Sequence, residues 1–390
     1  MEGKRFIHSL RLENLLSYGS EAEEIELQPL NVLIGSNASG KSNLIEALNI
    51  LKATPTDLLV PFRQGGGISE FFWKGDKNSS SAKIEAIINK HQDIESLRYW
   101  LNFTIVGQKL ELLDEAIASA SINNNIRDES FFYYRFGIDE PILMTRRIAP
   151  KSDDEKWYNQ GTGVSFSNNQ SILSQLQEPR KYPEIGYLQK QFSKICLYRE
   201  LLTGRSSELR SPQKVDLPEH PVLEDGSNLG LVLNNLQHQL GSRKIIDKLK
   251  KFYNAVEEIS IKIYGGTVQI FIREEGLTQP IPANRLSDGT LRYLFLMALL
   301  LDPTPPPLIC IEEPEIGLHP DILPTIAEML IEASQRTQLI VTTHSDALVS
   351  AIPPESVLVC ERDDKGTHLH RLEPEKLKNW GSCVLSVLKL

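Results

Sequence analysis

A glycine-spaced loop that ends in lysine and serine is the part of this chain best suited to chemistry. It follows a short apolar segment at residues 30–34, and a helical pattern of apolar residues follows it. Gly35 and Gly40 would let backbone N–H groups point at phosphate, and Lys41 would supply a positive charge to the β- and γ-phosphates. Ser42 would offer its hydroxyl to Mg²⁺. A chance glycine loop is the alternative, but strand, loop and helix follow one another in register. We therefore predict that a nucleoside triphosphate is held by Gly35, Ser36, Asn37, Ala38, Ser39, Gly40, Lys41, Ser42 and Asn43.

Two adjacent glutamates end the apolar segment at residues 308–311. In a nucleotide-hydrolysing site, Glu312 would contact Mg²⁺ directly or through water, and Glu313 would polarise the attacking water. Two solvated glutamates at a strand end are the alternative. The wholly apolar segment and its abrupt end at Pro314 favour the site, so we predict Glu312 as a metal residue and Glu313 as a catalytic residue.

A histidine and a helix start could complete the site. His344 follows the apolar segment at residues 339–343, at the carboxyl end of a predicted buried strand, where ligands of open α/β sheets bind. A lone histidine is equally often structural or merely exposed. Residues 285–290 begin a helix with Ser287 or Asp288 as its cap, and such a helix end can bind an anion. As a capping motif alone this signal is weak, because many helices start this way.

The composition narrows the class of protein. A net charge of −9 over 390 residues argues against a surface coated in positive charge for nucleic acid, although a local basic groove remains open. The basic cluster at residues 243–251 is more simply a solvated helix face. Four cysteines lack metal-binding spacing and resemble buried thiols: Cys196, Cys310, Cys360 and Cys383. The longest apolar run, residues 294–301, is too short to span a bilayer, and no signal segment is evident. We expect a cytoplasmic protein without a membrane partner.

The chain changes character twice along its length. Strand, loop and helix patterns at residues 1–82 predict the first part of an α/β nucleotide-binding domain. Period-two segments and then helical spacing at residues 83–256 predict an inserted antiparallel β lobe and a helical connector. Apolar strands alternate with helices again at residues 257–390, which predicts that the nucleotide-binding domain resumes there.

The motifs stand in an order that resembles the ABC-type ATPase head domains of the RecF, SMC and OLD-like group. The order is the phosphate loop, Leu-Ser-Asp-Gly-Thr at 286–290, an apolar strand ending in Glu-Glu-Pro-Glu at 315, and Thr-His-Ser at 343–345. The resemblance covers about residues 1–75 and 225–375, and it is greatest to the stand-alone RecF-like bacterial ATPases. It implies a P-loop NTPase of ABC-ATPase head type.

The resemblance also implies roles for particular residues. It implies an ATP-hydrolysing, head-to-head dimer with two ATP molecules at the interface, each held by one subunit's loop and capped by the other's signature helix. Ser287 and Gly289 would then contact nucleotide in trans. His344 would take the position that senses the γ-phosphate, and the turn at residues 317–320 would cross the dimer axis. Gln64, before three glycines, would be the glutamine that couples magnesium to the lobe.

Two departures from the group's transporter members stand out. The signature at residues 286–290 reads Leu-Ser-Asp-Gly-Thr where transporter ATPases usually carry Leu-Ser-Gly-Gly-Gln, and Glu312 stands where aspartate is usual. Both variants resemble the RecF and OLD side. OLD-type nucleases continue into a Toprim domain, and we expect no such nuclease centre in the short stretch after residue 362.

These observations support two functions of different class. The first is an ATPase whose ATP-dependent dimer acts on or with DNA, non-specifically, in repair or phage defence. The alternative is a nucleotide-gated regulatory subunit of a toxin or nuclease system, which binds a partner protein rather than DNA. The resemblance favours the first and the acidic charge the second. A transporter motor is disfavoured by the long insertion and the signature variant.

Overall fold

The computed structural model describes residues 3–76, 80–89, 95–120, 131–136, 142–148, 155–159 and 166–371. Cys383 lies outside these residues. Within the described residues, no helix is both long and apolar enough to cross a membrane.

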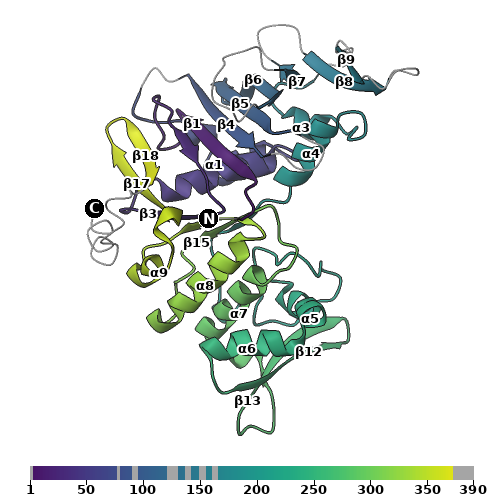
Figure 1. Ribbon diagram of the computed structural model, residues 1–390, viewed down its shortest axis with the longest axis vertical. Helices are drawn as coiled ribbons and strands as arrows, with labels where there is room; N and C mark the ends of the chain where they lie inside the picture. Colours follow the sequence, from purple (N-terminus) through teal and green to yellow (C-terminus); the bar gives the residue numbers. More distant parts are fainter. Residues whose placement is uncertain are drawn as a thin grey trace.

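A six-stranded sheet forms the centre of the molecule (Figure 1). Its order is β10-β15-β16-β3-β17-β18, and all neighbours are parallel except β17 and β18. Its strands are β3 Leu30–Ile34, β10 Cys196–Tyr198, β15 Leu308–Glu312, β16 Gln338–Thr342, β17 Val357–Asp363 and β18 Gly366–Arg371. The apolar strands β3 and β16 are buried at every residue, as parallel strands covered on both faces must be. The carboxyl ends of β3, β15 and β16 meet at one edge, which brings the three predicted motifs together.

A second, antiparallel sheet forms the lobe, in the order β2-β1-β4-β5-β6-β7-β8-β9. Its strands are β1 Ile7–Glu13, β2 Glu24–Glu26, β4 Ser81–Ile88, β5 Leu97–Val106, β6 Lys109–Ser119, β7 Phe132–Phe136, β8 Ile142–Ile148 and β9 Glu155–Asn159. The sheet includes the amino-terminal strands, because Leu10 of β1 pairs with Ala86 of β4. The lobe is therefore built from both sides of the phosphate loop, a long-range pairing that local patterns do not contain.

Helices cover both faces of the central sheet. α1, Lys41–Ala53, packs between the two sheets and shares one hydrophobic core with them, through Leu44, Ile45 and Leu48. α7, Asp288–Leu300, and α8, Leu323–Ser334, cover the opposite face and belong to a second core. The remaining helices are α2 Leu59–Gln64, α3 Ile172–Gln175, α4 Pro183–Phe192, α5 Leu229–Leu240, α6 Ser242–Phe252 and α9 Asp346–Ser350, with short 3-10 turns at Ile68–Phe71, Ala283–Arg285, Pro320–Ile322 and Pro354–Ser356. The phosphate loop thus leads into a helix clamped between two sheets.

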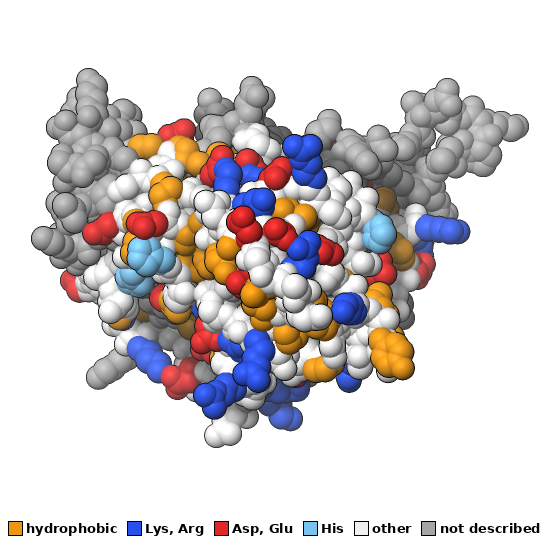
Figure 2. Space-filling model, turned by 90° about the horizontal axis from the view of Figure 1, so that it is seen from below, with side chains coloured by type: hydrophobic (Ala, Val, Ile, Leu, Met, Phe, Trp, Pro, Cys, Tyr) orange, Lys and Arg blue, Asp and Glu red, His pale blue; other side chains and the backbone are white. Residues whose placement is uncertain are grey.

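A small antiparallel sheet lies at the lower end of Figure 1, against α5 and α6. It contains β11 Gln213–Lys214, β12 Val256–Tyr264, β13 Thr267–Glu274 and β14 Ile281–Pro282. β12 and β13 lie where the sequence predicts that the nucleotide-binding domain resumes, but they form this separate sheet instead of extending the central one. Figure 2 shows this end of the molecule, where basic and acidic side chains are interspersed.

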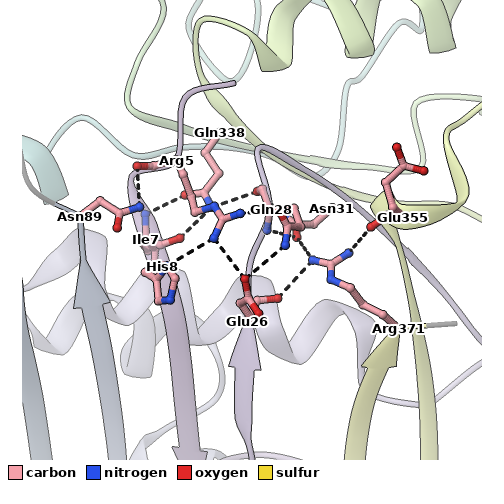
Figure 3. Close-up of polar contacts among 10 residues, drawn as sticks. All are labelled: Arg5, Ile7, His8, Glu26, Gln28, Asn31, Asn89, Gln338, Glu355 and Arg371. Carbon is pink, nitrogen blue, oxygen red and sulfur yellow. Dashed lines mark hydrogen bonds and ion pairs between the residues drawn. The ribbon is translucent and has the colours of Figure 1, made fainter. Parts of the chain in front are cut away.

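A polar network ties the lobe to the amino ends of the central strands (Figure 3). The Gln338 side chain accepts from the backbone N–H of Ile7 at 2.8 Å and donates to the carbonyls of Ile7 and Gln28. Asn31 donates to the carbonyl of Gln28 at 2.6 Å, and Arg371 donates to the side-chain oxygen of Asn31 at 2.8 Å. The bonds of Gln338 and Arg371 join segments more than 300 residues apart and fix how the lobe sits on the central sheet.

Candidate functional site

Residues 35–42 form a tight turn that follows β3, and its last two residues begin α1. The φ angles of Gly35 and Gly40 are 149° and 107°. A Cβ at Gly35 would lie 2.2 Å from the carbonyl oxygen of Cys360, and one at Gly40 would lie 2.3 Å from Oγ1 of Thr367. Only glycine suits either position. Ala38 also has a positive φ, 64°, without being glycine, which is a strain typical of functional loops.

Lys41 lies inside this turn. Its buried side chain donates from Nζ to the carbonyls of Gly35 at 2.9 Å and Ser36 at 2.8 Å. Burial lowers the pKa of Lys41, against the opposing effects of Cys360 and Glu313. No side chain caps the amino end of α1, which leaves this helix end suited to an anion. A cation and a helix amino end therefore face the same small space, as phosphate binding requires.

A cleft of about 550 Å³ opens beside the start of the turn. It is lined by Gly35, Ser36, residues 359–363 at the end of β17, and His368. Its size is within the range of small-molecule sites. The turn is thus open to a ligand larger than a phosphate ion.

Ser42 and Glu312 join the turn to the end of β15. The Ser42 hydroxyl donates to Oε2 of Glu312 at 3.1 Å. Burial raises the pKa of Glu312, while Arg199 and the Ser42 hydrogen bond oppose that effect. A hydroxyl and a carboxylate oxygen side by side are ligands that Mg²⁺ accepts. These two residues could therefore contribute to a magnesium site.

Glu313 and His344 lie beside this pair. Glu313 has a φ of 47°, and its backbone N–H donates to the carbonyl of Thr342 at 2.9 Å, which turns the chain sharply at the end of β15. Nε2 of His344 lies 3.9 Å from Oε1 of Glu313. The side chains predicted to act on water and on the γ-phosphate therefore face each other.

Glu315 is a part of the site that the sequence reasoning missed. Its Oε1 accepts from the hydroxyl of Thr343 at 2.6 Å and from the backbone N–H of His344 at 2.8 Å. Glu315 thereby fixes the start of the loop that carries the histidine. The only sequence signal was a third acidic residue just after the Glu-Glu pair.

Seven buried side-chain polar atoms lack a partner among the described residues, and three of them belong to residues near this edge. In the described residues, such atoms include Oγ of Ser39, Nη2 of Arg199 and Oε2 of Glu315. The others are Oδ1 of Asn14, Asn102 and Asp114, and Nε of Arg371. Folded proteins leave few such groups, and each of them can instead bind a ligand or water. The described residues hold no cluster of three or more metal-ligating side chains. Ser42 and Glu312 supply two oxygen atoms, and Mg²⁺ commonly takes its other ligands from water and phosphate.

The signature residues do not reach the phosphate loop of their own chain. The Ser287 hydroxyl caps α7 by accepting from the backbone N–H of Thr290 at 3.1 Å. A Cβ at Gly289 would lie 3.0 Å from the carbonyl oxygen of Gly317, in the turn predicted to cross the dimer axis. Arg210 forms an ion pair with Asp288 and donates to the carbonyl of Leu286 at 2.7 Å. Among the described contacts, none joins Ser287 or Gly289 to residues 35–42.

Gln64 is the last residue of α2, and no described contact joins it to Ser42 or Glu312. Its role at the metal stays a prediction. Arg199 instead lies next to Glu312, with Nε 3.7 Å from Oε1. Sequence reasoning missed Arg199, because it follows a three-residue strand that no periodicity reveals.

The sequence of this chain matches a known protein family and a phage protein. The model of the family described as "AAA domain, putative AbiEii toxin, Type IV TA system" matches residues 30–350. The Old nuclease of Escherichia phage P2 is 26% identical over 381 residues, which cover 90% of this chain and 59% of the nuclease. The chain thus spans less than two thirds of that relative.

Solved structures of SMC head domains share the fold. A head bound to the C-winged helix domain of ScpA aligns with a TM-score of 0.59 at 14% identity, over 95% of this chain and 99% of that one. A head with an extended coiled coil, bound to the C-terminal domain of ScpA and derived from Pyrococcus furiosus, aligns with a TM-score of 0.54 at 13% identity, over 99% and 100%. The predicted fold is confirmed: an ABC-ATPase head with an inserted antiparallel lobe and a helical connector.

Proposed function

The chain belongs to the AAA-domain family whose model matches residues 30–350, among the RecF, SMC and OLD-like ATPases, and from that premise we propose that it hydrolyses ATP. The observation that carries this proposal is the 3.1 Å hydrogen bond between Ser42 and Glu312. It joins the phosphate loop to the acidic strand end, where Glu313 and His344 face each other. The turn after β3, the start of α1 and the ends of β15 and β16 thus lie together and carry the groups that phosphoryl transfer needs.

Each side chain has a task in this proposal. Lys41 and the amino end of α1 bind the β- and γ-phosphates. Ser42 and Glu312 offer oxygen ligands to magnesium, which when bound would neutralise charge on the phosphates. Glu313 orients the attacking water and accepts its proton, and His344 holds the far side of the γ-phosphate.

The site is completed by a second copy of the chain. Ser287 and Gly289 lie at the exposed start of α7 and make no described contact with their own phosphate loop. In a two-fold dimer, the helix end of one subunit would cap the nucleotide of the other. ATP would then stabilise the dimer by binding across the interface.

Sedimentation of Glu313→Gln, with and without Mg·ATP, tests the shared site. This variant should keep ATP and shift from monomer to dimer when Mg·ATP is added. The double variant Lys41→Ala/Glu313→Gln is the control and should stay a monomer. A monomer of Glu313→Gln in both conditions would refute the shared site.

Mixing two inactive chains tests the same geometry in a second way. Lys41→Ala removes the phosphate lysine, and Ser287→Arg blocks the capping helix. Each variant alone should be inactive, but a mixed dimer keeps one intact site, so an equal mixture should recover about one quarter of the wild-type rate. No recovery in a mixture shown to form mixed dimers would contradict capping in trans.

The cellular role that we propose is action on or with DNA in repair or phage defence. Likeness to the Old nuclease of a phage supports it. The contrary observation is on α6, where Lys248 and Lys251 pair with Glu332 and Glu328 of α8 at 2.9 Å and 2.5 Å. Charge neutralised in this way is less available to a DNA backbone. This favours the second candidate, a nucleotide-gated regulatory subunit that binds a toxin or nuclease protein.

Titration of labelled duplex at several salt concentrations, with saturating ATP, separates these two roles. Replacing Lys250 and Lys251 by Glu should weaken binding to all sequences and lower the salt slope by up to about one per lost contact. The matched control carries the same charge change at Lys190 and Lys194, next to the lobe. Equal effects of both variants would remove α6 from the DNA proposal. Absence of binding by the wild type would favour the protein-partner role.

A further inference from the structure

Arg199 lies between two carboxylates at the edge of the proposed magnesium position. It follows β10, the strand beside β15. Its Nη1 forms an ion pair with Oε2 of Glu46, and its Nε lies 3.7 Å from Oε1 of Glu312. The guanidinium therefore bridges α1 and the end of β15.

Three contacts link four side chains, Ser42, Glu312, Arg199 and Glu46, which we call a ring because its two end members lie on one face of α1. Ser42 and Glu46 are four residues apart in α1, so they lie on the same face of the helix. Ser42 donates to Oε2 of Glu312, while Arg199 faces Oε1. Each oxygen of Glu312 thus has its own neighbour, and the carboxylate cannot rotate without disturbing one of them.

Partial burial strengthens this ring. The side chains of Glu46 and Glu312 are 16% and 19% exposed, and that of Arg199 is 35% exposed. Charge pairs shielded from water in this way interact more strongly than pairs on the open surface. Nη2 of Arg199 is buried without a partner among the described residues, so the guanidinium keeps one donor beyond those that bind the ring.

The glutamate at position 312 explains why its carboxylate would need contacts that hold it in place. Glutamate has one more rotatable bond than the aspartate usual at this position, so its carboxylate loses more freedom when it is held in one place. Groups around a ligating carboxylate orient it and tune metal affinity. We propose that Arg199, held by Glu46, is a positioning residue that keeps Oε2 of Glu312 on the Ser42 side, where magnesium binds. This inference rests on the proposed function.

The test measures how much magnesium strengthens nucleotide binding, without relying on turnover. A fluorescent ATP analogue is titrated into each variant in EDTA and at a series of Mg²⁺ concentrations. Arg199→Gln should raise the Mg²⁺ concentration needed for half of the affinity gain by about 10-fold, the lower range for loss of a group that orients a metal ligand. Its affinity in EDTA should stay within about 2-fold of wild type, because the phosphate loop is intact.

Three further variants sharpen the result. Arg199→Lys keeps the charge and should restore part of the loss. Glu46→Gln removes the ion pair that holds Arg199 but keeps Arg199 itself, so it should raise the Mg²⁺ requirement as Arg199→Gln does. This variant tests the inference if Arg199→Gln does not fold. Arg273→Gln is the matched control, because Arg273 pairs with Glu257 and Glu258 and its side chain is also 35% exposed. It should leave the Mg²⁺ requirement unchanged.

The outcomes are distinct. A lower Mg²⁺ requirement in Arg199→Gln would show that Arg199 only repels the cation, and would overturn the inference. An equal loss in EDTA and in Mg²⁺ would also overturn it, since the effect would not pass through the metal. If the wild type binds no nucleotide, the proposed function itself fails.

Discussion

Polar side chains at the two edges of the central sheet differ in how completely they are hydrogen-bonded within the protein. At the amino edge, the Gln338 side chain makes hydrogen bonds of 2.8 to 3.2 Å to the backbone of residues 6–7 and Gln28. At the carboxyl edge, Arg199 and Glu315 keep buried atoms without a partner among the described residues. The Gln338 amide at the amino edge has all its hydrogen bonds within the protein, whereas Arg199 and Glu315 at the carboxyl edge do not.

The kind of neighbour explains this difference. Arg371 at the amino edge also has an unpartnered Nε, but it donates to the carbonyls of Glu355 and Glu26. Those acceptors are neutral. At the carboxyl edge, Glu313 lies close enough to Glu312 to raise the pKa of Glu312, and such like charges favour a bound cation. Side-chain amides whose hydrogen bonds are all made within the protein therefore stabilise the fold. Neighbouring carboxylates that can still accept a ligand indicate the site.

Glu313→Gln should have the largest effect and should act on turnover alone. It removes the group that accepts a proton from water, so the ATP hydrolysis rate should fall by roughly 10² to 10⁴ while ATP affinity is retained. Steady-state hydrolysis and nucleotide titration measure the two quantities. The matched control is Glu355→Gln at the amino edge, where only the backbone carbonyl is used. An equal loss of hydrolysis rate in both variants would contradict the claim that only the carboxyl edge takes part in catalysis.

Gln338→Ala should act on stability alone. It removes the acceptor of the buried N–H groups of residues 6–7 and a donor to the carbonyl of Ile7, whereas the carbonyl of Gln28 keeps its bond from Asn31, so the free energy of unfolding should fall by about 2 to 4 kcal/mol. Chemical denaturation measures this loss, and Gln239→Ala on the exposed face of α5 is the control. If Gln338→Ala keeps wild-type stability but loses ATP affinity, the amino edge is not purely structural.

The lobe contains a further buried carboxylate, Glu115, which accepts hydrogen bonds from three neighbouring residues. It accepts from Tyr99 at 2.8 Å and from the backbone of Ile172 at 2.8 Å, and also from Ser171. Burial raises its pKa from 4.5 to about 7, although these hydrogen bonds oppose the shift. Between these two values the folded state binds a proton that the unfolded state releases.

Stability should therefore fall as pH rises through this window, by at most about 3 kcal/mol from this group. Unfolding of wild type and Glu115→Gln, followed from pH 4 to pH 8, checks the sign. The variant should show a smaller decline, with part of the decline left because burial also raises the pKa of Asp302 and Glu312. Identical slopes in the two proteins would contradict the raised pKa of Glu115.

Lys251→Ala should have the smallest effect. Its ion pair with Glu328 joins two side chains that are 44% and 49% exposed, and such surface pairs contribute less than about 1 kcal/mol. The free energy of unfolding should change by no more than that, and less so at high salt. A loss comparable to that of Gln338→Ala would mean that α6 holds the fold as firmly as the amino edge does.

The site could be predicted where its residues are close in sequence. The spacing of Gly35, Gly40 and Lys41 after an apolar strand, and the paired glutamates ending another, are local patterns with a direct chemical meaning. The structure brings these groups together because the carboxyl ends of parallel strands meet at one edge. Their roles in catalysis stay predictions.

The remainder depends on long-range pairing. The contact of Arg199 with Glu46 and the bond of Gln338 with Ile7 join residues that are far apart in the chain, and no local pattern contains them. The same holds for β1, whose partner β4 lies beyond the phosphate loop. The predicted place of Gln64 came from the resemblance alone, and no described contact supports it.

Nucleotide binding by wild type and Lys41→Ala is the most direct test of the central claim, that residues 35–42 hold ATP. Calorimetric titration with Mg·ATP should show binding by the wild type and a loss of at least about 100-fold in Lys41→Ala, because the buried ammonium is the charge that faces the phosphates. An unchanged unfolding midpoint would show that the variant is folded. Equal ATP affinity in the two proteins would contradict the phosphate site and the function built on it.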